Sequence, residues 1–375
     1  MFGKQIKLFK LLGFEVRIDW SWMVIAILIV WSLSTNYFPA YYRNLTAEAY
    51  WLMGIAGALG LFLSIVVHEF CHSIVARGYG LPMKGITLFL FGGVAEMGDE
   101  PASAKVEFMM AFVGPLSSIV VGLICYGSYI FGTKYNWPEP LLGVLGYLAF
   151  INWMLAGFNL LPAFPLDGGR VLRSILWAAK NNLRWATRVS SAVGSGFGFI
   201  LMGMGVLRLM TGNVIGAMWW FLIGLFLRNA AVMSYQQLVV RRALEGEKVS
   251  RFMSKDAVTV APTLTVEEMV NDYLYKYDYK MFPIVEAGRL RGCITTKEVK
   301  EVPRSEWAKR HVADIASECS PANTIQPDAD ATKALTLMNQ TGSSRLIVVE
   351  NSRLKGVITL KDMLRFLSTK VELGG

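Results

Sequence analysis

Residues 51–72 of this 375-residue chain, WLMGIAGALGLFLSIVVHEFCH, decide how the first part of the protein folds. The first 17 of them carry no charge. A helix needs about 20 predominantly apolar residues to cross the hydrocarbon core of a bilayer. The stretch is therefore expected to cross a membrane, although it ends in three ionisable residues, His68, Glu69 and His72.

The composition supports a membrane protein. Hydrophobic residues make up 54% of the chain and charged residues 17%, whereas soluble domains average about a quarter charged residues. The apolar segments are concentrated before about residue 236. Spans are expected near residues 18–35, 51–76, 106–131, 141–161, 190–210 and 213–234. The expected fold is a multi-pass α-helical membrane protein with about six transmembrane helices, followed by a soluble α/β region.

The placement of basic residues predicts the orientation of these spans. The net charge is +9, and Lys4, Lys7, Lys10 and Arg17 precede the first span. Because basic residues accumulate on the cytoplasmic side, the N-terminus is expected in the cytoplasm, and six crossings return the C-terminus there. The expected location is the cell membrane. The positive charge is explained by topology and the lipid bilayer, so no nucleic-acid partner is expected.

Residues 68–72, HEFCH, have the spacing of a metal site on a helix. His68 and His72 lie one turn apart on one face, where both can bind one ion, and Glu69 beside them can act as a general base. Ionisable groups within a transmembrane helix cost roughly 2.5–3.5 kcal/mol each and usually have a function. The pattern therefore predicts a zinc site for hydrolysis.

A catalytic zinc site usually has three protein ligands, so a third is needed. Residues 159–170, NLLPAFPLDGGR, place Asp167 after an apolar span that two prolines interrupt. Broken helices at membrane depth are tolerated where they line a cavity. Asp167 is therefore the candidate third ligand. The open alternative is that Asp167 caps the helix that begins after it.

The two motifs together resemble those of the site-2 proteases, a family of intramembrane zinc metalloproteases of the peptidase M50 type. The resemblance rests on HEFCH and NLLPAFPLDGG and covers about residues 51–175. It implies one Zn²⁺ per chain, bound by His68, His72 and Asp167. It also implies that Glu69 activates water and that Asn159 helps to hold the scissile carbonyl.

The activity implied by the resemblance is that of a zinc metalloendopeptidase. Such an enzyme hydrolyses peptide bonds in or near transmembrane segments of other proteins, and a single-span membrane protein is the expected substrate. The alternative from another class is a transporter or channel gated by the C-terminal region, with the same residues forming an ion path. A metal-binding pseudoprotease is a third reading, which the presence of Glu69 disfavours.

Residues 82–101, PMKGITLFLFGGVAEMGDEP, are too short and interrupted to form another span. The pattern predicts a strand over 86–91, a turn at Gly92–Gly93 and a second strand over 94–97. The family resemblance implies a β-hairpin close to the zinc. An exposed edge at Gly92, Gly93 and Val94 could bind an unwound substrate by strand addition. The alternative is a hairpin that only plugs the cavity.

The soluble region contains an internal duplication. Residues 281–299 and 345–363 align without a gap at an offset of 64 residues. The repeats resemble a tandem pair of cystathionine-beta-synthase (CBS) domains, which implies clefts for ATP or another adenine nucleotide as a regulatory ligand. The expected organisation is a transmembrane metalloprotease domain (1–236, core 51–175), a linker (237–248) and two CBS domains (249–307 and 308–375).

The nucleotide motif of that family, G-x-x-T-x-x-D, occurs twice in altered form. The first copy has Thr295 and Glu298, and the second has Thr359 and Asp362. Only the second keeps the aspartate, so nucleotide binding is expected mainly at Thr359 and Asp362. The alternative is a dimerisation platform with empty clefts, which would make the protein a homodimer.

Overall fold

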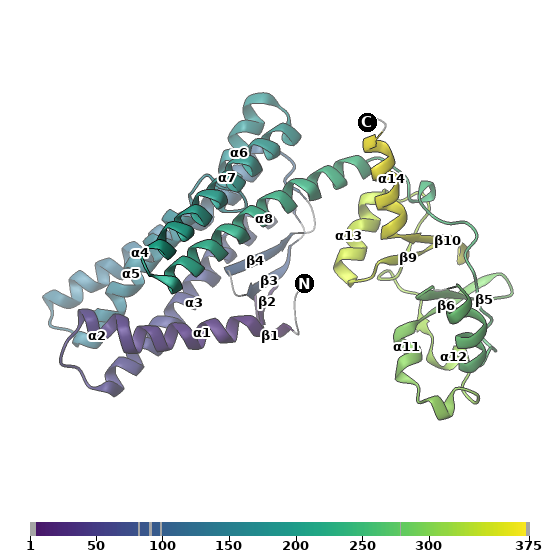
Figure 1. Ribbon diagram of the computed structural model, residues 1–375, viewed down its shortest axis with the longest axis horizontal. Coiled ribbons are helices and arrows are strands. Elements are labelled where there is room, and N and C mark those ends of the chain that lie inside the picture. The colour runs from purple at the N-terminus through teal and green to yellow at the C-terminus, as the bar shows by residue number, and fades with distance from the viewer. Residues whose placement is uncertain (1–4, 82, 90–91, 98–99, 278, 373–375) are drawn as a thin grey trace. The chain divides into compact units, whose positions relative to one another are not determined.

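The computed structural model describes residues 5–81, 83–89, 92–97, 100–277 and 279–372 (Figure 1). The chain divides into two compact units, Met1–Gln236 and Gln237–Gly375. The first holds the long apolar helices, and the second holds the duplicated region.

Among the described residues, six helical stretches are long and apolar enough to cross a membrane. They are Trp22–Tyr41, Ala47–Gly78, Ala104–Lys134, Glu139–Asn159, Leu183–Met210 and Val214–Leu244. The first is built from α1 (Trp20–Ser32), the π-helical turn η1 (Leu33–Tyr37) and α2 (Phe38–Tyr41), and the others are α3, α4, α5, α7 and α8. A shorter helix, α6 (Asp167–Lys180), lies between α5 and α7 in the sequence. The expected multi-pass helical fold is confirmed.

A four-stranded sheet accompanies these helices, in the order β1-β2-β3-β4. Its strands are β1 (Gln5–Leu11), β2 (Phe14–Asp19), β3 (Met83–Phe89) and β4 (Gly92–Met97). β2 alternates buried and less buried residues, and Val16 packs against Val66 of α3. The first hairpin was not expected from the sequence. Its signal is the turn at Leu12 and Gly13, both of which have positive φ angles.

The expected hairpin after α3 is present, but its turn was placed wrongly. Gly92 and Gly93 are strand residues that pair with Phe89 and Leu88. The two residues between the strands, 90 and 91, lie outside the described part of the chain. The error arises because alternating apolar residues indicate a strand without fixing its register. Val94 pairs with Thr87 in the same ladder.

The second unit contains two three-stranded sheets, β5-β6-β7 and β10-β9-β8. The first copy comprises α9 (Val266–Glu268), η3 (Met269–Leu274), α10 (Tyr275–Tyr277), β5 (Met281–Glu286), β6 (Arg289–Thr295) and α11 (Thr296–Glu301). The second comprises β8 (Thr324–Ile325), α13 (Ala331–Thr341), β9 (Arg345–Glu350), β10 (Arg353–Thr359) and α14 (Leu360–Glu372). Met281 and Cys293 of the first sheet pack with Ile347 of the second, so the two sheets share one core cluster.

Each copy completes its core with residues that lie outside its own repeated strands and helices. Leu244 and Val249 are buried in the core of the second copy. Val312, in α12 (Val312–Ile315), is buried in the core of the first copy, and β7 (Ser317–Glu318) pairs with β6. The stretch expected as a linker, residues 237–248, is helical as far as Leu244, where α8 ends.

Candidate metal centre and regulatory site

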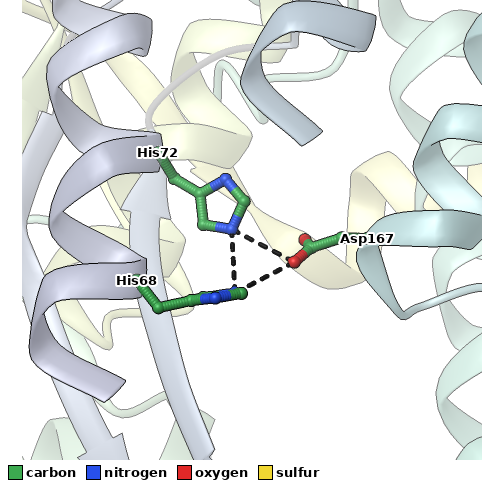
Figure 2. Close-up of side chains that lie close together, drawn as sticks. All are labelled: His68, His72 and Asp167. Carbon is green, nitrogen blue, oxygen red and sulfur yellow. Dashed lines mark hydrogen bonds and ion pairs between the residues drawn. The ribbon is translucent and has the colours of Figure 1, made fainter. Parts of the chain in front are cut away.

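The three side chains expected to bind a metal converge in the structure. His68 and His72 lie four residues apart on α3 (Ala47–Gly78), and only 4% and 5% of their surfaces are exposed. Asp167 is the first residue of α6 and extends toward both imidazoles (Figure 2). Its Oδ2 atom lies 3.0 Å from Nε2 of His68 and 3.2 Å from Nε2 of His72. The two Nε2 atoms are 3.2 Å apart.

The chemistry of this cluster suits a cation. Nδ1 of His72 donates to the carbonyl oxygen of Met110 at 2.5 Å, so a neutral imidazole turns its Nε2 lone pair toward Asp167. Nδ1 of His68 lies 2.9 Å from Oγ of Ser118. Tetrahedral zinc bonds of about 2.0–2.1 Å place ligand atoms roughly 3.3 Å apart, close to the observed separations. Two histidines and a carboxylate in this arrangement therefore fit zinc.

One face of α4 (Ala104–Lys134) packs against the two histidines of the cluster. Met110, Gly114 and Ser118 recur every four residues, so they lie on the same side of the helix. A Cβ atom on Gly114 would lie 2.2 Å from Nε2 of His72 and 2.8 Å from Nε2 of His68. The missing side chain at Gly114 thus leaves the space in which the ligand nitrogens meet.

The supporting role of Met110, Gly114 and Ser118 was not expected from the sequence. The carbonyl group of Met110 has no sequence signal, because any residue can provide it. Ser118 could have been found from its four-residue spacing to Gly114, which points both toward one helix face.

Two glycines after Asp167 allow α6 to approach the chain that precedes it. A Cβ atom on Gly168 would lie 2.2 Å from the carbonyl oxygen of Leu160. A Cβ atom on Gly169 would lie 2.2 Å from the backbone nitrogen of Phe164. Only glycine permits these contacts. The sequence LDGG therefore fixes where α6 begins and where Asp167, its first residue, lies.

The other predicted residues of this site occupy different positions around it. Glu69 follows His68 on α3, is partly buried, and lies within electrostatic reach of His72 and Asp167. Asn159 is the last residue of α5 (Glu139–Asn159) and is also partly buried. Among the described residues, the group that can hold a metal consists of His68, His72 and Asp167.

The two nucleotide motifs of the second unit differ in how their carboxylates are bonded. Glu298 accepts hydrogen bonds from the backbone N–H and Oγ1 of Thr295, and from Oγ of Ser317 at 2.8 Å. Asp362 accepts one from Oγ1 of Thr359 at 2.6 Å. Burial alone would raise the pKa of Glu298, but the hydrogen bonds from Thr295 and Ser317 lower it.

Asp362 also borders an open cavity of about 310 Å³, which Ser254 and Arg251 help to line. Ser254 pairs with Val357 of β10, as Ser317 pairs with Cys293 of β6. Ser254 is therefore the counterpart of Ser317 in the second copy. In the first copy the longer glutamate on α11 bonds the serine of β7, whereas in the second copy Asp362 and Ser254 line a cavity.

Comparison with known proteins identifies the family. The model of peptidase family M50 matches residues 56–143 and 137–204, and the CBS domain model matches residues 249–304 and 312–369. Zinc metalloprotease MJ0392 of Methanocaldococcus jannaschii is 31% identical over 97% of this chain and 96% of that protein. The chain belongs to peptidase family M50.

Two further relatives of this M50 protein have similar names. The protein sll0528 of Synechocystis sp., also named as a zinc metalloprotease, is 33% identical over 98% of this chain and 96% of that one. The solved site-2 protease of Methanocaldococcus jannaschii is 28% identical, covers 61% of this chain and 94% of that chain, and has a TM-score of 0.42.

Membership of family M50 confirms the resemblance drawn from the two motifs, and the match to the CBS domain model confirms the resemblance drawn from the duplication. The M50 protein is an intramembrane zinc metalloprotease with a multi-pass membrane region and a tandem CBS pair. It therefore acts on membrane proteins within the lipid bilayer. The alternative of a channel or transporter is not supported, because the family match covers the helices that carry the histidines and Asp167.

Proposed function

We propose that this M50 protease binds one zinc ion per chain through His68, His72 and Asp167. The observation that carries the proposal is the convergence of two Nε2 atoms and one carboxylate oxygen at 3.0–3.2 Å. Zinc, when bound, supplies Lewis-acid chemistry that polarises a carbonyl group and acidifies water.

Glu69 and Asn159 would complete the catalytic site. Glu69 accepts a proton from the attacking water and returns it to the leaving amine nitrogen, so that peptide hydrolysis balances without another acid. Its place next to His68 on α3, within electrostatic reach of His72 and Asp167, supports this role. The Asn159 side chain donates a hydrogen bond to the scissile carbonyl oxygen as negative charge develops there, an interaction often worth about 3 kcal/mol.

The substrate would bind as an extended strand. A transmembrane helix satisfies its backbone hydrogen bonds internally, so it must unwind locally before a peptide bond can be cut. β4 is the last strand in the order β1-β2-β3-β4, which leaves the outer edge of Gly92, Gly93 and Val94 for pairing with such a segment. β4 contacts α3, the helix that carries the histidines, which supports a substrate strand bound near them.

The proposed substrates are single-span membrane proteins cut near the cytoplasmic face, with both termini of the protease in the cytoplasm. The basic residues before the first span and the six apolar helices support this orientation. The test is co-expression of candidate single-span proteins with the wild type or with Glu69→Gln. A substrate is cut only by the wild type, and equal cutting by both would disprove the mechanism.

We further propose that an adenine nucleotide modulates cleavage by binding the second CBS copy at Thr359 and Asp362. The specific support is the asymmetry of the two motifs, since Glu298 already bonds Thr295 and Ser317 whereas Asp362 borders a cavity. A carboxylate of this kind can hold ribose hydroxyls. Arg251, which lines the same cavity, suits a phosphate.

The competing role for the CBS pair is to hold two chains together as a homodimer. Light scattering of the purified full-length protein, with and without ATP, separates the two roles. Nucleotide binding by a protein whose mass does not change supports regulation. A dimer that binds none of ATP, ADP and AMP supports the platform instead.

A further inference from the structure

A buried ion pair joins α4 to α6 next to the metal centre. Glu107, in the first turn of α4, is fully buried, and Arg173 on α6 is 7% exposed. Nε of Arg173 donates to Oε1 of Glu107 at 2.6 Å. Burying two charges costs several kcal/mol per ion, and their mutual attraction offsets this cost only when the contact geometry is good. A contribution to stability is therefore not a sufficient explanation for a buried ion pair.

Arg173 connects α4 to both sides of Asp167. It follows Asp167 by six residues on α6, and its guanidinium lies 5.0 Å from the ring centre of Phe164, three residues before Asp167. One side chain therefore contacts Glu107 of α4 and the segment that leads into α6. Arg170 is a poor substitute, because its Nε atom is 3.9 Å from Oε1 of Glu107.

Glu107 extends the face of α4 that already supports the histidines. Its spacing of three residues to Met110 puts both residues on one side of the helix. Along this face, the carbonyl group of Met110 contacts His72 and the hydroxyl group of Ser118 lies next to His68. The third ligand, Asp167, lies on α6, and this helix is joined to the same face of α4 through Glu107 and Arg173.

We propose that Glu107 and Arg173 are positioning residues that hold Asp167 at the distance from the histidines that zinc binding requires. The proposal rests on the ligand set given under the proposed function. α4 then acts as a single support for all three ligands, through one backbone carbonyl, one hydroxyl group and one ion pair.

The test is a double-mutant cycle between Glu107→Gln and Asp167→Ala, read as zinc affinity of the purified full-length protein in competition with a chromogenic chelator. Loss of a group that orients a metal ligand typically weakens metal binding by about 10–100-fold, and this is the loss expected for Glu107→Gln. In the Asp167→Ala background, Glu107→Gln should cost less than about twofold, because the ligand through which it acts is gone.

A matched control is Asn152→Ala. Nδ2 of Asn152 donates to Oγ of Ser64 at 2.9 Å, a buried polar contact between α5 and α3. Its loss should lower the thermal midpoint while leaving zinc affinity unchanged, which separates positioning from general destabilisation. If Glu107→Gln does not fold, Glu107→Asp and Arg173→Lys replace it, since both keep the charges but alter the contact.

The outcomes distinguish the inference from the proposed function. Equal losses for Glu107→Gln in both backgrounds would overturn the positioning role, as would unchanged zinc affinity in folded Glu107→Asp and Arg173→Lys variants. If Asp167→Ala itself leaves zinc affinity unchanged, the ligand set is wrong and the positioning role is excluded with it. The proposal is supported if Glu107→Gln lowers zinc affinity in the wild-type background but not in the Asp167→Ala background.

Discussion

Replacing Gly114 with alanine tests whether the space at the metal centre is functional. The new Cβ atom would lie 2.2 Å from Nε2 and 2.4 Å from Cε1 of His72, whereas ordinary contacts begin at 3.4 Å. The imidazole must therefore move by about 1.2 Å or α4 must withdraw. Because Nδ1 of His72 is bonded to the Met110 carbonyl, neither movement is free.

The expected magnitude follows from this displacement. Extra volume in a packed interior costs about 1–3 kcal/mol, and a displacement of about 1 Å in a catalytic group can cost roughly 100-fold in rate. We therefore expect Gly114→Ala to lower zinc affinity and the rate of cleavage by about 100-fold. The measurements are chelator competition and cleavage of a single-span substrate by the purified protein.

Gly127→Ala provides the control on the same helix. A Cβ atom on Gly127 would meet no atom within 4 Å, so zinc affinity and cleavage should both stay at wild-type values. Gly114→Ala with wild-type zinc affinity and rate would refute the inferred geometry of the site. Equal losses in both variants would mean that any change to α4 is harmful, which would also refute it.

Three further predictions concern the ligands of the protein. Glu69→Gln should retain zinc, measured by metal analysis, yet lose cleavage, because an amide cannot accept the proton; retained cleavage would contradict this. Zinc removal by a chelator should destabilise the wild type by about 2.7 kcal/mol when free zinc had been 100 times its Kd, with little effect on Asp167→Ala. Asp362→Ala should weaken adenine nucleotide binding to the full-length protein, measured by calorimetry, more than Glu298→Ala does; the reverse order would exclude the second copy as the main site.

Much of the membrane region could be predicted because its signals are local. The absence of charge over about 20 residues indicates a span by itself, and the spacing of His68 and His72 places both on one helix face. Asp167 lies 95 residues after His72, so no local spacing links them; it was inferred from the need for a third ligand and from the family resemblance. The structure brings them to 3.2 Å.

The supporting contacts could not be predicted because they depend on tertiary packing. A glutamate at position 107 looks like the first-turn acid of a helix, which is a common and favourable place for it. Only the packing of α6 against α4 reveals that Arg173 neutralises it. The register of the hairpin at Gly92 and Gly93 was likewise set by pairing with β3 rather than by local composition.

The exchange of segments between the two CBS copies sets the order in which the soluble region can fold during synthesis. The first copy cannot complete its core until Val312 has left the ribosome. The second needs Leu244 and Val249 near its beginning and Met363 near its end, so the early residues must wait for more than one hundred others. Contacts between distant residues slow folding and leave apolar surface exposed in the meantime. The membrane region therefore has time to insert while the soluble region is still incomplete, and a ribosome that stalls between the copies would release a chain in which neither core is closed.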